Sequence, residues 1–268
     1  MNDGDAIRTR LRALISDGSQ IAGTGLGAAI GLLWPDPTTV IGAAMAGSAI
    51  GIVSNDIAGR VLSPRERSRM GAALIFSIQS LESAMASGAK IREDGFFDAD
   101  SKDAPEVIEG VLRVARDSYE ERKLPYIGNL LASIAVDPAI TREMAHMLIA
   151  LSSGLSWNDF QILAVYDRKE SFHFPKVEWQ VRDWPEWTVA AAIAQLVGNR
   201  LLAYPRVSSG RLKLTYANDT ISGIELGEAG RLFVQTTQLN SMPIDEIREL
   251  ATMLENANGE TPTWLAAD

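Results

Sequence analysis

The sequence contains no cysteine and only two histidines, His146 and His173. The absence of cysteine excludes disulfide bonds, thiolate metal sites and cysteine nucleophiles. The two histidines have no spaced partner that would indicate a zinc site or a histidine-based catalytic triad. A GxxxxGK[ST] phosphate-binding loop is also missing. We therefore predict a protein that is not an enzyme and has neither a metal site nor a cofactor.

Positive charge is also scarce. The chain has 268 residues with 25 Lys and Arg against 34 Asp and Glu, which gives a net charge of -9. A general nucleic-acid binder carries the opposite sign, because phosphate neutralisation supplies most of its affinity. The hydrophobic content of 46% is ordinary for a folded protein. Together with the missing cysteines, this composition fits a cytoplasmic protein whose partner is not nucleic acid.

Charge is scarcest in residues 19–54, where 36 residues include a single charged side chain, Asp36. Small residues recur every four positions on both sides of this Pro-flanked aspartate, and that spacing places them on one helix face. Two helices can approach closely through such faces. We predict a glycine-zipper helical hairpin whose packing residues are Gly23, Gly27, Gly31, Ala43, Gly47 and Gly51.

The length of the hairpin leaves its location open. Its two apolar runs, 21–34 and 39–54, have 14 and 16 residues and would reach roughly 21–24 Å, less than the roughly 30 Å of bilayer hydrocarbon. Arginines flank the hairpin on both sides and its turn has none, so a spanning hairpin would leave both of its ends in the cytoplasm. Three alternatives remain: a buried core hairpin, a constitutive membrane hairpin, and one exposed to lipid only after a trigger.

The rest of the chain predicts a mostly helical protein. Residues 2–17 form an amphipathic pattern, and further helices are expected over 63–87, 104–123, 125–136 and 141–151. Residues 89–103 lack any period and predict a loop. Its aspartates, Asp94, Asp98 and Asp100, indicate a solvated acidic loop, because the glycine and glutamate of a calcium loop are missing.

The pattern of predicted elements changes at Ser156, where strands begin to accompany the helices. Helices are expected over 156–166 and 183–198, then strands over 200–204 and 212–216, a junction at 224–227 and a helix over 228–239. This order resembles a winged helix, and a last helix is expected over 243–254. We predict a mainly α protein with four parts: amphipathic helix and hairpin (1–62), helical domain (63–154), winged-helix-like α+β module (155–239), and C-terminal helix and tail (240–268).

A winged helix raises the question of DNA binding. Residues 155–237 hold nine cations and nine anions, so this module lacks the basic surface expected of a DNA reader. Four cations do cluster around the expected wing, and they are the candidate nucleic-acid or partner contacts: Arg200, Arg206, Arg211 and Lys213. We favour a contact with protein over one with DNA.

The order of these features resembles the abortive-infection alpha (Abi-alpha) family of bacterial domains over roughly residues 105–236. The residues that carry the resemblance are the run ERKLPYIGNLLAS at 121–133, the break Asp137-Pro138, the helices 141–151 and 156–166, and the junction at 226–230. A glycine-rich hairpin before such a module is also similar to membrane-acting effectors of bacterial antiphage systems. The resemblance implies a cell-suicide role and supplies no catalytic residues.

From this we predict a non-enzymatic effector of a bacterial antiphage system. It would be cytoplasmic, conditionally associated with the inner membrane, and would oligomerise through the glycine-zipper hairpin to compromise that membrane. Its expected partners are further copies of itself or a sensor protein, and membrane lipid. The alternative is a soluble protein-interaction or DNA-binding regulatory module with a winged-helix-like fold.

Overall fold

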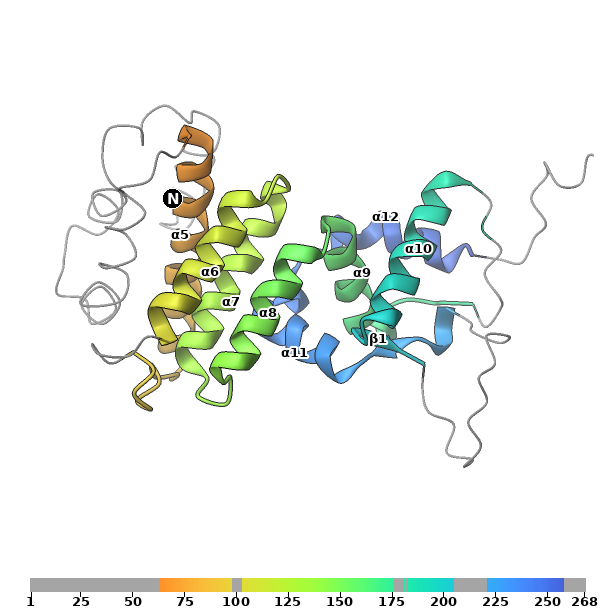
Figure 1. Cartoon of the computed structure of the whole chain (residues 1–268). Helices are drawn as coiled ribbons and strands as arrows, with labels where there is room; N and C mark the ends of the chain where they lie inside the picture. Colours follow the sequence, from red (N-terminus) through yellow and green to blue (C-terminus); the bar gives the residue numbers. More distant parts are fainter. Residues whose placement is uncertain (1–62, 98–102, 176–180, 182, 205–220, 258–268) are drawn as a thin grey trace, which may run out of the picture. The chain divides into compact units, whose positions relative to one another are not determined.

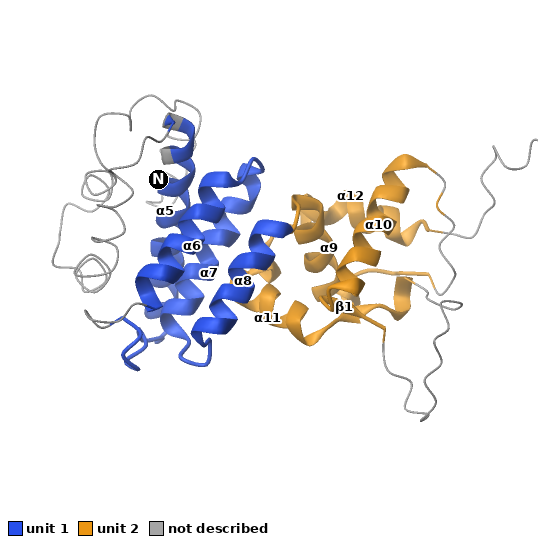
Figure 2. Ribbon diagram, in the orientation of Figure 1, with its two compact units in different colours: residues 1–154 blue, residues 155–268 orange. Residues whose placement is uncertain are grey.

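The computed structural model describes residues 63–97, 103–175, 181, 183–204 and 221–257 (Figure 1). Within these ranges the protein is mainly helical, with two short strands. The chain divides into two compact units between Gly154 and Leu155 (Figure 2). The amphipathic segment 2–17, the hairpin with Gly23, Gly27, Gly31, Ala43, Gly47 and Gly51, and the predicted strand 212–216 lie outside the described residues.

Unit 1 is a set of packed helices. They are α5 (Pro64–Ala86), α6 (Asp103–Asp117), the short 3-10 helix η2 (Glu121–Lys123), α7 (Leu124–Val136) and α8 (Arg142–Gly154). Helices α5, α6 and α7 pack against one another, and α8 packs against α6 and α7. Fully buried aliphatic side chains from these helices form the core, among them Leu74, Leu81, Ile108, Leu112, Ile127 and Leu130.

The start of α5 is set by a capping box. The Ser63 hydroxyl accepts a hydrogen bond from Glu66 N at 3.3 Å, and the Glu66 carboxylate accepts one from Ser63 N at 2.7 Å. Pro64 occupies the first helical position, where its missing N–H costs nothing. The hydrogen bonds from Ser63 hold the pKa of the Glu66 carboxyl below its ordinary value. The predicted start at Ser63-Pro64 is confirmed.

The predicted end of the helix over 104–123 is wrong. The expected helix 104–123 ends at Asp117, and residues 118–120 turn the chain before η2 begins. The reason is that the apolar face of α6 ends with Ala115, while the last residues, 120–123, are charged and offer no continuing stripe. The Ser118 hydroxyl donates to the Glu120 carbonyl at 3.2 Å and closes the turn.

The contact between α5 and α7 is the most extensive in unit 1. It depends on Gly128 of α7, whose Cα lies directly against the backbone of α5. A Cβ at Gly128 would sit 2.5 Å from the Ala73 carbonyl oxygen, 2.7 Å from Phe76 Cβ and 2.9 Å from Ser77 N. Small residues thus let two backbones approach closely. The Ser77 hydroxyl is buried at this crossing and has no hydrogen-bond partner within the described part of the chain.

Unit 2 is organised around α9 (Trp157–Asp167). The other elements are η3 (Lys169–Ser171), α10 (Trp184–Gly198), β1 (Leu202–Ala203), η4 (Ile221–Gly223), β2 (Glu225–Leu226), α11 (Glu228–Thr237), η5 (Leu239–Ser241) and α12 (Ile244–Glu255). Helix α9 packs against α10, α11, α12 and β2. At the centre, the rings of Phe160 and Phe233 meet edge to face with centroids 5.4 Å apart, and both are fully buried.

The two strands form a short antiparallel pair. Leu202 of β1 lies opposite Leu226 of β2, and Ala203 lies opposite Glu225. Chain segments more than twenty residues apart are therefore brought together immediately after α10 and immediately before α11. The side chains that follow α9 support this arrangement, since Lys169 Nζ donates to the Ile224 carbonyl at 2.9 Å.

The helices that the structure describes include none whose length and hydrophobicity would suffice to cross a lipid bilayer.

Candidate interaction surface

Helix α10 carries two exposed tryptophans, of which Trp184 is the most exposed large hydrophobic side chain in the part of the chain that is described. Its start is capped by Asp183, whose carboxylate accepts a hydrogen bond from Glu186 N at 2.9 Å. Pro185 sits in the first turn, as expected for a helix start. This cap fixes the first turn in place and projects Trp184 and Trp187 from it.

The two faces of α10 differ sharply. One face carries Val189, Ile193 and Leu196, which are buried in unit 2. The opposite face is exposed and carries Trp184, Trp187, Ala191, Ala194 and Gly198. The intervals between these five residues are three, four, three and four, so they form one continuous seam along the helix. We call this set of five residues the α10 seam.

The tryptophans of the α10 seam are exposed over 79% and 55% of their surfaces. Their rings contact each other edge to face with centroids 5.8 Å apart. Tryptophan is rarely left in water, because each ring holds a large apolar area, and exposed aromatic pairs of this kind mark contact surfaces.

The α10 seam is also uncharged. The only ionisable side chain within α10 is Glu186, and it is buried at 4% exposure. No lysine or arginine lies anywhere on this helix. The α10 seam is therefore suited to an apolar contact.

The sequence pattern predicts a helix over 183–198 but not this exposed surface. The signal that could have found it is the three-and-four spacing of Trp184, Trp187, Ala191, Ala194 and Gly198 without an intervening charge.

Of the four predicted contact cations, only Arg200 lies among the described residues. It follows the end of α10, is exposed, and adopts a left-handed backbone conformation with φ 60°. Its side chain is therefore on the connection to β1 and not on the α10 seam. Arg206, Arg211 and Lys213 lie outside the described residues, so the cluster stays a prediction.

Two glycines after β2, Gly227 and Gly230, allow close packing against the connection between α10 and β1. A Cβ on Gly227 would collide with the Arg200 carbonyl oxygen, and one on Gly230 would collide with the Leu201 carbonyl oxygen. Gly227 N donates a hydrogen bond to that same Leu201 oxygen at 2.9 Å. The junction singled out at 226–230 thus packs its backbone directly against the residues that leave α10.

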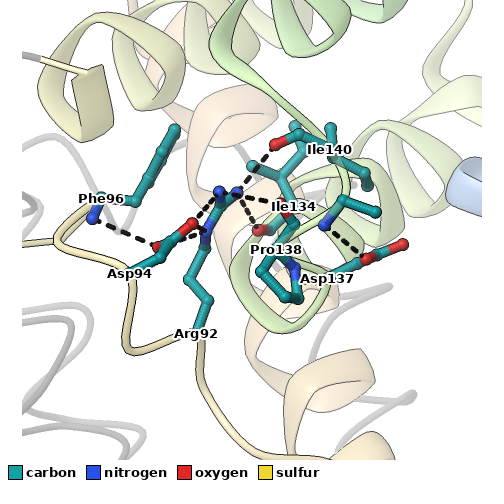
Figure 3. A network of polar contacts seen from close by, with 8 residues as sticks. Arg92, Asp94, Phe96, Ile134, Asp137, Pro138 and Ile140 are labelled. Atoms are coloured by element: carbon teal, nitrogen blue, oxygen red, sulfur yellow. Dashed lines mark hydrogen bonds and ion pairs between the residues drawn. The ribbon is translucent and has the colours of Figure 1, made fainter.

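Unit 1 contains a polar cluster around Arg92 (Figure 3). The guanidinium of Arg92 is buried and donates to three carbonyls at the end of α7 and in the following turn: Ile140 at 2.9 Å, Ile134 at 3.3 Å and Pro138 at 3.4 Å. A cation in this position satisfies carbonyls that the end of a helix leaves free. This cluster has a structural role, because it fastens the loop after α5 to the α7–α8 turn.

Asp94 and Phe96 complete that cluster. The Asp94 carboxylate accepts from Arg92 Nε at 2.9 Å, and the Phe96 ring lies with its centroid 4.2 Å from the guanidinium carbon. Hydrogen bonding to Arg92 holds the pKa of Asp94 below its ordinary value. The sequence predicts Asp94 in a solvated acidic loop, and in the structure its carboxylate forms an ion pair with Arg92. Asp98 and Asp100 lie outside the described residues.

The Glu106 carboxylate of α6 lies close to two side chains of α8. His146 on α8 is about half exposed, with Nε2 4.0 Å from a Glu106 oxygen, and Arg142 pairs with the same carboxylate. Within the described ranges, no three His, Asp or Glu side chains gather closely enough to hold a metal ion. Burial raises the pKa values of the Tyr166 phenol and the Asp167 carboxyl.

Comparison of the chain with protein family models, with curated proteins and with solved structures finds no match.

Proposed function

We propose that the chain is a non-enzymatic effector of bacterial abortive infection. In this proposal the hairpin of residues 19–54 oligomerises at the inner membrane of the cell and compromises it after a trigger. The observation that carries the proposal is the sequence of that stretch. Its 36 residues include a single charged side chain, and glycine or alanine recurs at every fourth position in both apolar runs. Until the trigger acts, the protein is cytoplasmic.

The folded units have a supporting role in this proposal. The resemblance to Abi-alpha domains covers parts of both units and concerns apolar packing positions. The uncharged α10 seam, with tryptophans exposed over 79% and 55% of their surfaces, is typical of a protein contact. We therefore assign these units to assembly and to the response to a sensor, and the hairpin to the membrane step.

The test substitutes leucine on the proposed packing face. A double variant, Gly27→Leu and Gly47→Leu, fills the small-residue seam of both runs. The matched control, Gly25→Leu and Ala49→Leu, adds the same side chains to the same runs on the opposite helix faces. Each variant is produced from an inducible promoter in a bacterial host. Growth, membrane potential measured with a dye, and the membrane-bound fraction of the protein are then recorded.

We expect the packing-face variant to lose toxicity and depolarisation and the control to keep both. Leucine makes each run more apolar wherever it is placed, so a loss caused merely by altered hydrophobicity would appear in both variants. If the packing-face variant depolarises the membrane as the unaltered chain does, the proposal is wrong.

A second candidate function is a soluble regulatory module, in which a winged-helix-like unit 2 holds a partner protein. The observation that favours it is again the α10 seam. In a winged-helix-like arrangement α10 would occupy the position of the helix that enters a DNA groove, and it offers no cation to phosphates or bases. A protein partner suits this helix better than DNA.

Titration of a labelled DNA duplex at several salt concentrations tests the DNA alternative. We expect no salt-dependent binding by the unaltered chain and no change on Arg211→Ala with Lys213→Ala. Salt-sensitive affinity that falls in this double variant would instead establish the DNA-binding reading. Fractionation then separates the other two functions, since a purely soluble module stays in the supernatant under every condition.

A further inference from the structure

We infer that the α10 seam is the contact between two copies of this chain, which pack α10 against α10 in antiparallel orientation. This contact is separate from the hairpin and goes beyond the proposed membrane function. The inference starts from the shape of the seam. Its N-terminal half carries the two tryptophans, and its C-terminal half carries Ala194 and Gly198, with Ala191 between them.

Large residues at one end and small ones at the other make the seam complementary to itself. When a second α10 runs in the opposite direction, each tryptophan of one copy lies over the alanine and glycine half of the other. A parallel arrangement would instead place tryptophan against tryptophan at one end and leave a gap at the other. A two-fold axis near Ala191 places the tryptophans of each copy against the small residues of the other copy.

Charge also favours a second copy. Two identical surfaces always bring like charges together near the two-fold axis, and this repulsion opposes most self-contacts. The α10 seam has no ionisable side chain exposed along the helix, so that penalty is absent. The hydroxyl of the neighbouring Thr188 donates to the Trp184 carbonyl at 2.9 Å, so this polar group is already satisfied within the helix.

The available area predicts a weak dimer. Helix α10 has 15 residues and is about 22 Å long. Full burial of two tryptophans removes roughly 150–250 Å² each from water, and part of that area is already covered, so the four rings of a dimer contribute roughly 600 Å². With the small residues, the total stays below the lower limit of roughly 1,200 Å² for stable specific interfaces and falls in the range of weak, transient contacts. We therefore expect dimers that dissociate on dilution.

The test uses the purified full-length chain in sedimentation velocity over roughly 1–100 µM, a range in which weak dimers dissociate. All proteins carry Gly27→Leu and Gly47→Leu, so that hairpin association does not contribute. We expect a concentration-dependent dimer. Trp184→Ala with Trp187→Ala should raise its dissociation constant roughly 30-fold or more, as for hot-spot tryptophans. The control is Tyr119→Ala, which removes a ring exposed over 78% on unit 1 and should change nothing.

Cross-linking then tests the orientation. Because the chain has no cysteine, Ala191→Cys creates a single reactive thiol beside the proposed two-fold axis. A short bismaleimide should join Ala191→Cys chains into covalent dimers and leave Thr252→Cys chains, which carry an exposed thiol on α12, as monomers. A chain that is monomeric at every concentration, a dimer indifferent to the tryptophans, or a dimer that does not cross-link at position 191 would each overturn the inference. The Gly27→Leu and Gly47→Leu background takes the packing face of the hairpin from the proposed function, whereas cross-linking at position 191 reports the α10 contact whether or not the hairpin associates.

Discussion

The close crossing of α5 and α7 makes a sharp prediction for Gly128→Ala. In most helices this change is favourable, because glycine is about 1 kcal/mol worse than alanine in a helix interior. Here the added methyl group would lie 2.5 Å from the Ala73 carbonyl oxygen and 2.9 Å from Ser77 N, both of them backbone atoms. They cannot rotate away, so the two helices must separate.

The magnitude follows from two opposing terms. Overpacking a dense interior costs about 1–3 kcal/mol and occasionally more, and a methyl group against fixed backbone belongs at the upper end of that range. After the gain of about 1 kcal/mol from helix propensity, we expect Gly128→Ala to lower the free energy of unfolding by about 1–2 kcal/mol. The matched control is Gly71→Ala on α5, where an added Cβ would meet nothing within 4 Å. That change should stabilise the protein by about 0.5–1 kcal/mol.

Urea unfolding followed by far-ultraviolet circular dichroism measures both changes. Tryptophan fluorescence gives an internal reference for unit 2, because five of the six tryptophans follow residue 154. The reasoning is refuted if Gly128→Ala is as stable as the unaltered chain, or if Gly71→Ala costs as much as Gly128→Ala.

Two further predictions concern unit 1. Ser77→Ala removes a buried hydroxyl that has no hydrogen-bond partner among the described residues. We expect this change to raise the free energy of unfolding, measured with urea, by about 1 kcal/mol. A decrease of similar size would mean that the hydroxyl is hydrogen-bonded. Asp94→Asn tests the Arg92 cluster through pH. The pKa of Asp94 is lowered in the folded state. The ionised carboxylate therefore contributes to the free energy of unfolding above the ordinary aspartate pKa of about 3.9, and this contribution is lost as the pH falls through the lower pKa of the folded protein. We expect the variant to be less stable than the unaltered chain at pH 7 and the difference to shrink by pH 3; a constant difference would exclude this linkage.

Helix starts could be predicted well from the sequence, and the reason is local. Ser63, Ser156 and Asp183 each carry a side chain that accepts a hydrogen bond from the backbone three residues later. Such a cap depends only on neighbouring residues, so the sequence around it contains all the information. The end of α6 at Asp117 is marked by an apolar face that stops at Ala115, and a pattern of this kind places a helix end less accurately than a cap does.

The clusters that join distant segments could not be predicted in this way. Arg92 donates to carbonyls 42 to 48 residues away, and any arginine in a loop would look the same in the sequence. Gly128 resembles an ordinary helix glycine until α5 is placed against it. For α10, the helix itself was predicted, and its exposed face was missed because alanine suits buried and exposed positions equally.

The capping box at Ser63 also sets where α5 begins. Ser63 has extended backbone angles, φ -67° and ψ 156°, so no helix runs unbroken through it into α5. The first turn of α5 is closed by hydrogen bonds between Ser63 and Glu66. The starting point of this helix is therefore encoded in four consecutive residues and is independent of the contacts that the preceding residues make.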